Sequence, residues 1–96
     1  MVKANERDLS AVILTDMQAN GSYSNILLRK ALNKNNAMSA MQKAFVTETV
    51  NGVLRNFIYI DYILGHFSNT PVEKMKPYVL NVLRMSVYQL LFMRSE

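Results

Sequence analysis

The stretch that decides the fold is PYVLNVLRMSVYQLLFM, which occupies residues 77–93. Its apolar residues recur at spacings of three and four, which is the period of a helix that buries one face. The predicted stripe consists of Leu80, Leu83, Val87, Leu90 and Leu91, widened by Val79, Val82 and Phe92. A helix that is apolar on two sides is typical of the central, mostly buried helix of a bundle. We therefore predict one central helix from Pro77 to about Met93.

The segments before it are also helical in pattern. The first predicted helix runs from about Glu6 to Ala19 and ends at Gly21, a residue type that readily closes a helix. The second begins near Ser22 or Ser24 and ends in the asparagine-rich residues 33–36. The apolar residues of the first are Leu9, Val12, Ile13 and Met17. In the second, the inward residues are Leu27, Leu28, Ala31 and Leu32, and the outward ones are Arg29, Lys30, Asn33 and Lys34.

A long helical pattern follows over residues 39–67. It exceeds the length of a typical globular helix, so we expect a break near Arg55 or Asn56. Its apolar positions are Met41, Ala44, Phe45, Val53, Ile60, Ile63, Leu64 and Phe67. Gly52 costs about 1 kcal/mol relative to alanine inside a helix, which predicts a close approach by another helix there. The sequence thus predicts an all-α bundle of about five to six helices.

Three pairs of residues mark predicted helix starts, because each combines a capping side chain with a polar or charged partner a few residues later. The pairs are Asn5 with Asp8, Ser39 with Gln42, and Thr70 with Glu73 behind Pro71. Glu6 and Asp8 are interpreted as first-turn carboxylates that favour the helix dipole, not as an acid and base pair.

Several classes of function lack the residues they need. The chain has no cysteine, which excludes disulfides, thiolate metal sites and a cysteine nucleophile. Gly21, Gly52 and Gly65 stand alone, whereas a phosphate-binding loop needs clustered glycines. His66 is the single histidine, so we interpret it as a helix-end residue and not as a metal ligand. No segment approaches the ~18 uncharged residues of a membrane span, and we expect one soluble, cytoplasmic domain.

The surplus charge of the chain lies in one segment. Eleven lysines and arginines stand against seven aspartates and glutamates, which gives a formal net charge of +4. No carboxylate occurs between Asp16 and Glu48. The cations in this window are Arg29, Lys30, Lys34 and Lys43. They account for the whole surplus, because the other basic residues balance the acidic ones. A localised positive field attracts phosphate-bearing partners, which favours nucleic-acid binding.

The alternative for the basic window is a solvated helix end. Lys30 and Lys34 fall in the last turns of the second helix, where cations offset the dipole by roughly 0.3 to 1 kcal/mol. This does not explain the missing carboxylates, since a solvated face normally mixes charges of both signs. Tyr23 also lies in the window, and it could stack on a base or pack locally. We predict that Tyr59, Tyr62 and Tyr88 belong to the core, because they fall beside the apolar stripes.

Five strings carry a family resemblance. They are NERDL at residues 5–9, GSYSNILLRKAL at 21–32, AFVTETVNGVLR at 44–55, IDYIL at 60–64 and LRMSVYQLLF at 83–92. In this order and spacing they resemble the NusB-like N-terminal domain of the RsmB, or Sun/Fmu, family of bacterial cytosine-5 ribosomal RNA methyltransferases. The resemblance implies a compact NusB-like bundle over residues 1–96, a single RNA-binding domain that is truncated at its C-terminal end relative to a larger methyltransferase.

The resemblance also implies a division of labour. This domain holds small-subunit ribosomal RNA, and a separate domain binds S-adenosylmethionine and transfers the methyl group, so we assign no catalytic, cofactor or metal residue here. The RNA-binding residues that it implies are Arg7, Arg29 and Arg55, with Lys30, Lys34 and Lys43 extending the surface. Asp61 is expected to fix helix geometry. The implied partners are ribosomal RNA and the chain's own C-terminal methyltransferase domain, without a membrane.

Two alternatives stay open. The domain could be a NusB-type transcription antitermination or protein-interaction module, docking on its own methyltransferase domain or on a ribosomal protein. An uncovered apolar face on the last helix would favour such contacts and also self-association. A free-standing enzyme is the other alternative, but no set of residues in the sequence supports it.

Overall fold

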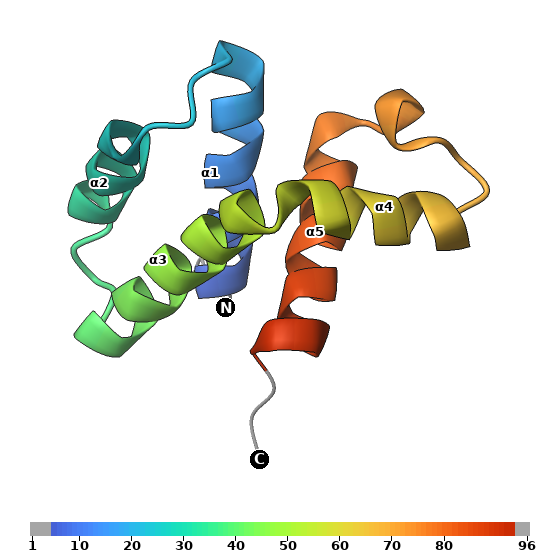
Figure 1. The fold of residues 1–96 in the computed structure, drawn as a ribbon. Helices are drawn as coiled ribbons and strands as arrows, with labels where there is room; N and C mark the ends of the chain where they lie inside the picture. The colour runs from blue at the N-terminus through green and yellow to red at the C-terminus, as the bar shows by residue number, and fades with distance from the viewer. Residues whose placement is uncertain (1–4, 94–96) are drawn as a thin grey trace.

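The computed structural model describes residues 5–93, which are all-α (Figure 1). The elements are α1 (Glu6–Asn20), α2 (Asn25–Lys34), α3 (Ala40–Arg55), α4 (Phe57–Phe67), the 3₁₀ turn η1 (Val72–Lys74) and α5 (Pro77–Phe92). The predicted all-α fold is confirmed. Lys3, which entered the charge balance, and residues 94–96, on which the expected truncation rested, lie outside the described residues.

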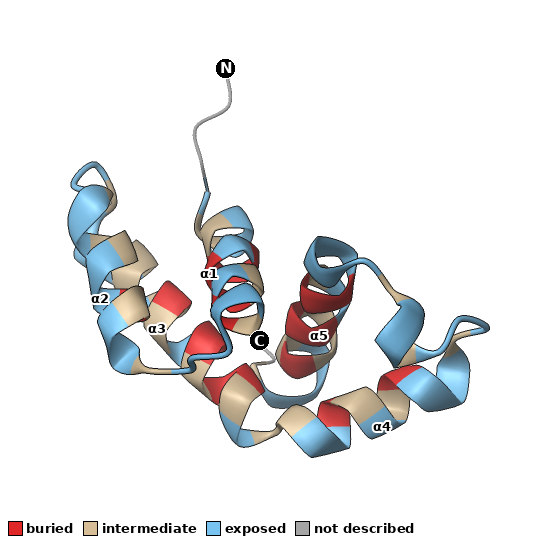
Figure 2. Ribbon diagram, turned by 90° about the horizontal axis from the view of Figure 1, so that it is seen from above, coloured by how far each residue is buried: buried red, intermediate tan, exposed pale blue. Residues whose placement is uncertain are grey.

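Three helices form the centre of the bundle. α1 packs against both α3 and α5, and α3 also contacts α5. α2 lies on one flank against α1 and α3, whereas α4 and η1 lie on the opposite flank, where α4 packs on α5 (Figure 1). In Figure 2 the buried residues of α1, α3 and α5 face the middle of the molecule. The outer sides of α2 and α4 are therefore free to meet partners on two separate flanks.

Local hydrogen bonds explain where the helices begin. The backbone amide of Asp8 donates to Asn5 Oδ1 at 2.7 Å and caps α1. Ser39 and Gln42 form a reciprocal capping box at the start of α3, with distances of 3.1 and 2.9 Å. These two predicted starts are confirmed. The third is wrong, because Thr70 precedes only the short turn η1, and α5 begins later without a side-chain cap.

The predicted break in the long helical pattern falls at Asn56. Its backbone amide and its Nδ2 both donate to the carbonyl of Gly52, at 3.1 and 2.9 Å, and close the last turn of α3. α4 begins at the next residue. Gly21 ends α1 with a φ of 64°, a left-handed conformation that glycine adopts without strain. Both predicted helix ends are therefore confirmed.

The buried face of α5 differs from the predicted one. Leu80 is buried as expected, but Leu90 is 73 % exposed. Other residues of the predicted face that are exposed are Val79, Leu83, Leu91 and Phe92. The buried residues are instead Leu80, Asn81, Arg84, Met85 and Tyr88. The face that enters the core is thus rotated by about 100°, one residue, from the apolar stripe.

Most other inward positions are as predicted. Buried residues from the predicted stripes include Ile13, Met17, Leu28, Val53, Ile60 and Leu64. Four apolar residues that were predicted to face the core are exposed instead, so these predictions are wrong; they are Val12, Met41, Ala44 and Phe67. The close approach expected at Gly52 is confirmed: a Cβ added there would overlap the ring of Tyr88 on α5. The glycine therefore lets α3 and α5 pack around a buried tyrosine.

Candidate nucleic-acid interface

α2 presents its cations on the side away from the core. Leu28 is buried, whereas Arg29, Lys30 and Lys34 are exposed, as the helical period predicts. In the part of the chain that the structure describes, the ion pairs are Arg55–Glu48 and Arg84–Asp61. None of them involves a cation of α2. These three side chains are therefore exposed and form no ion pair within the described residues.

A groove between α1 and α2 runs beside two of these cations. Lys30 and Lys34 line it opposite Asp16 of α1, around a cavity of about 240 Å³. The apolar floor consists of Leu9, Ile13, Leu27 and Ala31. Two ammonium groups against one carboxylate leave the groove with a net positive charge.

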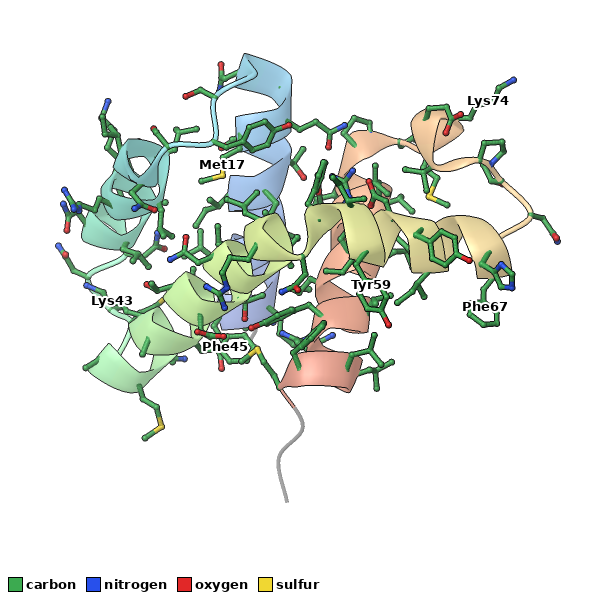
Figure 3. The ribbon with its side chains drawn as sticks, viewed as in Figure 1. Met17, Lys43, Phe45, Tyr59, Phe67 and Lys74 are labelled. Carbon is green, nitrogen blue, oxygen red and sulfur yellow. The ribbon has the colours of Figure 1, made fainter. Side chains whose placement is uncertain are left out.

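Lys43 extends this charge onto α3. Lys43 is half-buried, and Figure 3 places it beside the C-terminal end of α2, a helix that contacts α3. We define the α2 surface as Arg29, Lys30, Lys34 and Lys43. It contains all the surplus charge of the sequence, and α2 carries most of it.

The other two predicted RNA-binding residues lie apart from the α2 surface. Arg7 is on α1, and its Nη1 donates to Gln89 Oε1 of α5 at 2.6 Å, which directs it away from α2. Arg55 is at the end of α3, next to α4, and its Nη2 lies 3.6 Å from Glu48 Oε2. The structure therefore does not bring the six predicted residues into one patch, and their contact with RNA stays a prediction.

Asp61 has a structural contact, as the sequence analysis expected. Its two carboxylate oxygens accept from Arg84 Nε at 2.8 Å and Nη2 at 2.7 Å, which links α4 to α5. Arg84 Nη1 also donates to Asn81 at 2.9 Å, and the guanidinium lies 4.4 Å from the centre of the Phe57 ring. All parts of this buried guanidinium are thus occupied within the fold. Asp61 and Arg84 are therefore not candidates for an RNA contact.

Comparison with known proteins decides the family. Residues 4–96 match the NusB family, and this range is almost the whole chain. The chain belongs to the NusB family. No solved structure matches it significantly.

Two proteins that are similar in sequence to this NusB-family chain have names that describe an enzyme. It is 39 % identical over 95 residues to the probable ribosomal RNA small subunit methyltransferase B of Bacillus subtilis (strain 168), over 99 % of this chain and 21 % of that protein. It is 29 % identical over 87 residues to the protein of the same name from Synechocystis sp. (strain ATCC 27184 / PCC 6803 / Kazusa), over 91 % of this chain and 19 % of that protein. The chain therefore spans about a fifth of the length of these relatives.

The NusB-family chain also exposes aromatic residues that the sequence analysis assigned to the core. Tyr59 and Tyr62 of α4 are 53 % and 69 % exposed, so their assignment to the core was wrong. Tyr88 is buried as predicted. Tyr23 is half-exposed and packs its ring 6.4 Å from that of Phe57, which supports local packing. The sequence signal that could have identified the outer face is the spacing of Tyr59, Tyr62 and His66, which places them on one side of a helix.

Two other tyrosines hold carboxylates from separate helices. Tyr88 donates its hydroxyl to Glu48 of α3, and burial, followed by this hydrogen bond and the Glu48 charge, raises the pKa of Tyr88. Tyr78 donates to Asp8 Oδ1 at 2.6 Å, which raises the pKa of Tyr78. Both hydroxyls therefore remain protonated at neutral pH and connect α5 to α3 and α1. The carboxylates of Asp8 and Glu48 therefore accept hydrogen bonds within the fold.

The described residues contain neither a metal cluster nor a membrane-spanning helix. Within residues 5–93, no three histidine, aspartate or glutamate side chains gather as metal ligands would. No helix in that range is both long and apolar enough to cross a bilayer. The glycines also do not form a nucleotide cradle, because they lie on separate elements and the space at Gly52 is filled by Tyr88.

Proposed function

We propose that this NusB-family chain binds ribosomal RNA through phosphate contacts and positions it for a separate methyltransferase domain. The observation that carries the proposal is the α2 surface, whose three exposed helix cations have no ion-pair partner among the described residues. The names of the two relatives support the choice of ribosomal RNA as the polyanion. S-adenosylmethionine would bind the separate domain, which would modify a cytosine of small-subunit ribosomal RNA in the cytoplasm.

The chemistry of the α2 surface suits positioning better than base selection. Lysine and arginine contacts to phosphates release condensed counterions, so they supply affinity that does not depend on the sequence. Such contacts fix the register and orientation of the nucleic acid. The choice of base then belongs to the domain that performs the reaction. Arg7 and Arg55 would contribute only if the RNA extends beyond α2 to the ends of α1 and α3.

A filter-binding titration at several salt concentrations tests this proposal. With the 96-residue chain and a ribosomal RNA hairpin, affinity should fall steeply as salt rises, because each phosphate contact contributes about 0.7 to 0.9 to the slope of log K against log salt. The Arg29→Glu, Lys30→Glu variant should bind every RNA tested more weakly. The magnitude of its salt slope should fall by the amount expected for the loss of two phosphate contacts.

The matched control reverses two cations elsewhere. Lys74→Glu, Lys76→Glu changes the net charge by the same amount, but Lys74 ends η1 and Lys76 immediately precedes α5, on the flank away from α2. This variant should retain most of the affinity and the salt slope. A flat response to salt in the unmodified chain, or equal losses in the two variants, would contradict the proposed surface.

A second candidate function is a protein-interaction module of the NusB antitermination type. The observation in its favour is the exposure of Leu90, Leu91 and Phe92 near the end of α5. Large exposed apolar side chains that cluster mark protein contacts more often than bare surface. Static light scattering of the chain, alone and with an added catalytic domain, tests this candidate. A strict monomer in both samples would contradict it.

A further inference from the structure

The outer face of α4 is unusually aromatic for a solvent-exposed helix. Tyr59, Tyr62 and Phe67 are 53 %, 69 % and 82 % exposed, and His66 is exposed as well. Tyr59, Tyr62 and His66 are separated by three and four residues, so they follow one side of the helix. Tyr62 and His66 are stacked, with ring centres 6.1 Å apart and planes at 27°. The face therefore offers a row of flat rings whose outer sides meet water.

A groove continues this row towards α3. A cavity of about 610 Å³ is lined by Tyr59, Tyr62, Ile58 and Leu54, together with Arg55 and Asn56 at the junction of α3 and α4. One end of the groove thus carries a cation and an amide, and the other carries two aromatic rings. Within the described residues, neither tyrosine hydroxyl makes a hydrogen bond inside the protein, so both remain available to a ligand.

We propose that the outer face of α4 stacks unpaired bases of RNA, with Tyr59 and Tyr62 as the stacking residues and Arg55 as the contact to the backbone. The proposal rests on the proposed RNA-binding function and adds a class of substrate to it, single-stranded segments. Base stacking on aromatic rings needs a base that has left its helix, so duplex RNA does not use this face. The α2 surface, by contrast, contacts phosphates of any RNA.

The charges near the groove favour RNA over a protein partner. Asp61, the single carboxylate of α4, is held by Arg84. Glu48 accepts the Tyr88 hydroxyl, and its contact with Arg55 is an exposed pair at 3.6 Å, which is weak. Breaking the pair with Glu48 therefore costs little free energy, and Arg55 can contact a phosphate instead. Glu73 of η1 and Asp61 line a second hollow, which shares Ile58 and Tyr62 with the groove but does not include Arg55 or Tyr59. We therefore place the bases on the side of Tyr62 that faces Tyr59 and Arg55.

The test compares single-stranded and duplex RNA of equal length with Tyr59→Ala, Tyr62→Ala. Each lost stack should weaken binding of the single strand about 5- to 150-fold, because stacking on an aromatic ring contributes about 1 to 3 kcal/mol per base. Binding of the duplex should not change. The salt slope should also stay the same, since no phosphate contact is removed. Thermal unfolding confirms that the variant is folded, as expected for two exposed side chains.

The matched control keeps the rings and removes the hydroxyls. Tyr59→Phe, Tyr62→Phe should retain most of the single-strand affinity, because both faces of each ring remain. Ile58→Ala truncates an 83 % exposed aliphatic side chain that also lines the groove but offers no ring, so it should weaken single-strand binding far less than the tyrosine variant. If Ile58→Ala weakens binding as much as the tyrosine variant, the face is a general apolar contact suited to a protein, and the proposal is wrong.

The outcomes separate this inference from the proposed function. If the tyrosine variant binds single strands as the unmodified chain does, while the Arg29→Glu, Lys30→Glu variant loses all RNAs, the stacking surface is wrong and the phosphate surface stands. If the tyrosine variant alone loses single strands and the α2 variant loses nothing, the stacking surface stands and the α2 surface is wrong. If the unmodified chain binds neither RNA, both are overturned.

Discussion

Gly52 of α3 and Tyr88 of α5 pack directly against each other in the core. Tyr88 is 2 % exposed, its ring covers the backbone of Gly52, and its hydroxyl reaches Glu48 one turn earlier on α3. A side chain at position 52 would occupy the volume of the ring. The glycine is therefore needed for packing, and its lower helix propensity is offset by the burial of an aromatic side chain.

This contact gives a prediction for Gly52→Ala. Overpacking a core costs about 1 to 3 kcal/mol, and the better helix propensity of alanine returns about 1 kcal/mol. The free energy of unfolding should therefore fall by up to about 2 kcal/mol, measured by urea titration with circular dichroism. The control is the same change in a Tyr88→Leu background, where the overlapping ring atoms are absent. There Gly52→Ala should be neutral or stabilising, and an equal loss in both backgrounds would contradict the packing explanation.

At the scale of the element, α4 is attached to the centre by the buried side chains of Ile60 and Leu64 and by one largely buried ion pair. Arg84 of α5 is 6 % exposed and binds both oxygens of Asp61. The attraction between such charges roughly balances their loss of hydration, but removing one partner leaves the other charge buried and unpaired. The pair therefore fixes how α4 lies against α5, and with it the orientation of the outer aromatic face.

Asp61→Ala should destabilise the chain strongly for this reason. The expected loss is about 3 kcal/mol in the free energy of unfolding, measured by chemical denaturation. The double variant Asp61→Ala, Arg84→Met removes the unpaired charge and should recover much of that loss. Arg55→Ala, which removes one partner of the exposed pair with Glu48, should cost less than about 1 kcal/mol. A loss for Asp61→Ala no larger than that of Arg55→Ala would show that α4 is held by apolar packing alone.

The same pair explains why the face of α5 could not be predicted. Hydropathy ranks Leu83 and Leu90 above Arg84 as core residues, because an isolated buried guanidinium is costly. The cost disappears only when Asp61, which is distant in sequence, supplies the partner. Helix boundaries were easier, because the signals at Asn5, Ser39 and Asn56 act within a single turn. Local chemistry was therefore predictable, whereas pairing between helices was not.

At the scale of the whole molecule, the candidate interface divides between two flanks. The cations of the α2 surface could be predicted, because helical spacing alone separates Arg29 and Lys30 from Leu28. The separation of Arg7 and Arg55 from this surface could not, since it depends on how α1 and α3 pack. The exposure of the aromatic face of α4 was not predicted, because tyrosine is common both in protein cores and on solvent-exposed surfaces. The fold thus presents phosphate contacts on one flank and flat rings on the other (Figure 1).

An RNA that combines a duplex with a single-stranded arm should therefore bind more tightly than either part alone. Once the duplex is held at α2, the arm meets α4 at a high effective concentration, and affinity should exceed that of the duplex by roughly 100-fold or more. The gain requires an arm long enough to cross the molecule, whose longest extent is 38 Å, so affinity should rise with arm length and then level off. Filter binding of RNAs with a series of arm lengths measures this dependence.

The control pairs the arm with a complementary strand. Pairing adds phosphates but removes the unpaired bases, so it should abolish the gain in affinity, as should Tyr59→Ala, Tyr62→Ala. An affinity that grows equally with paired and unpaired arms would mean that charge alone guides the RNA across both flanks.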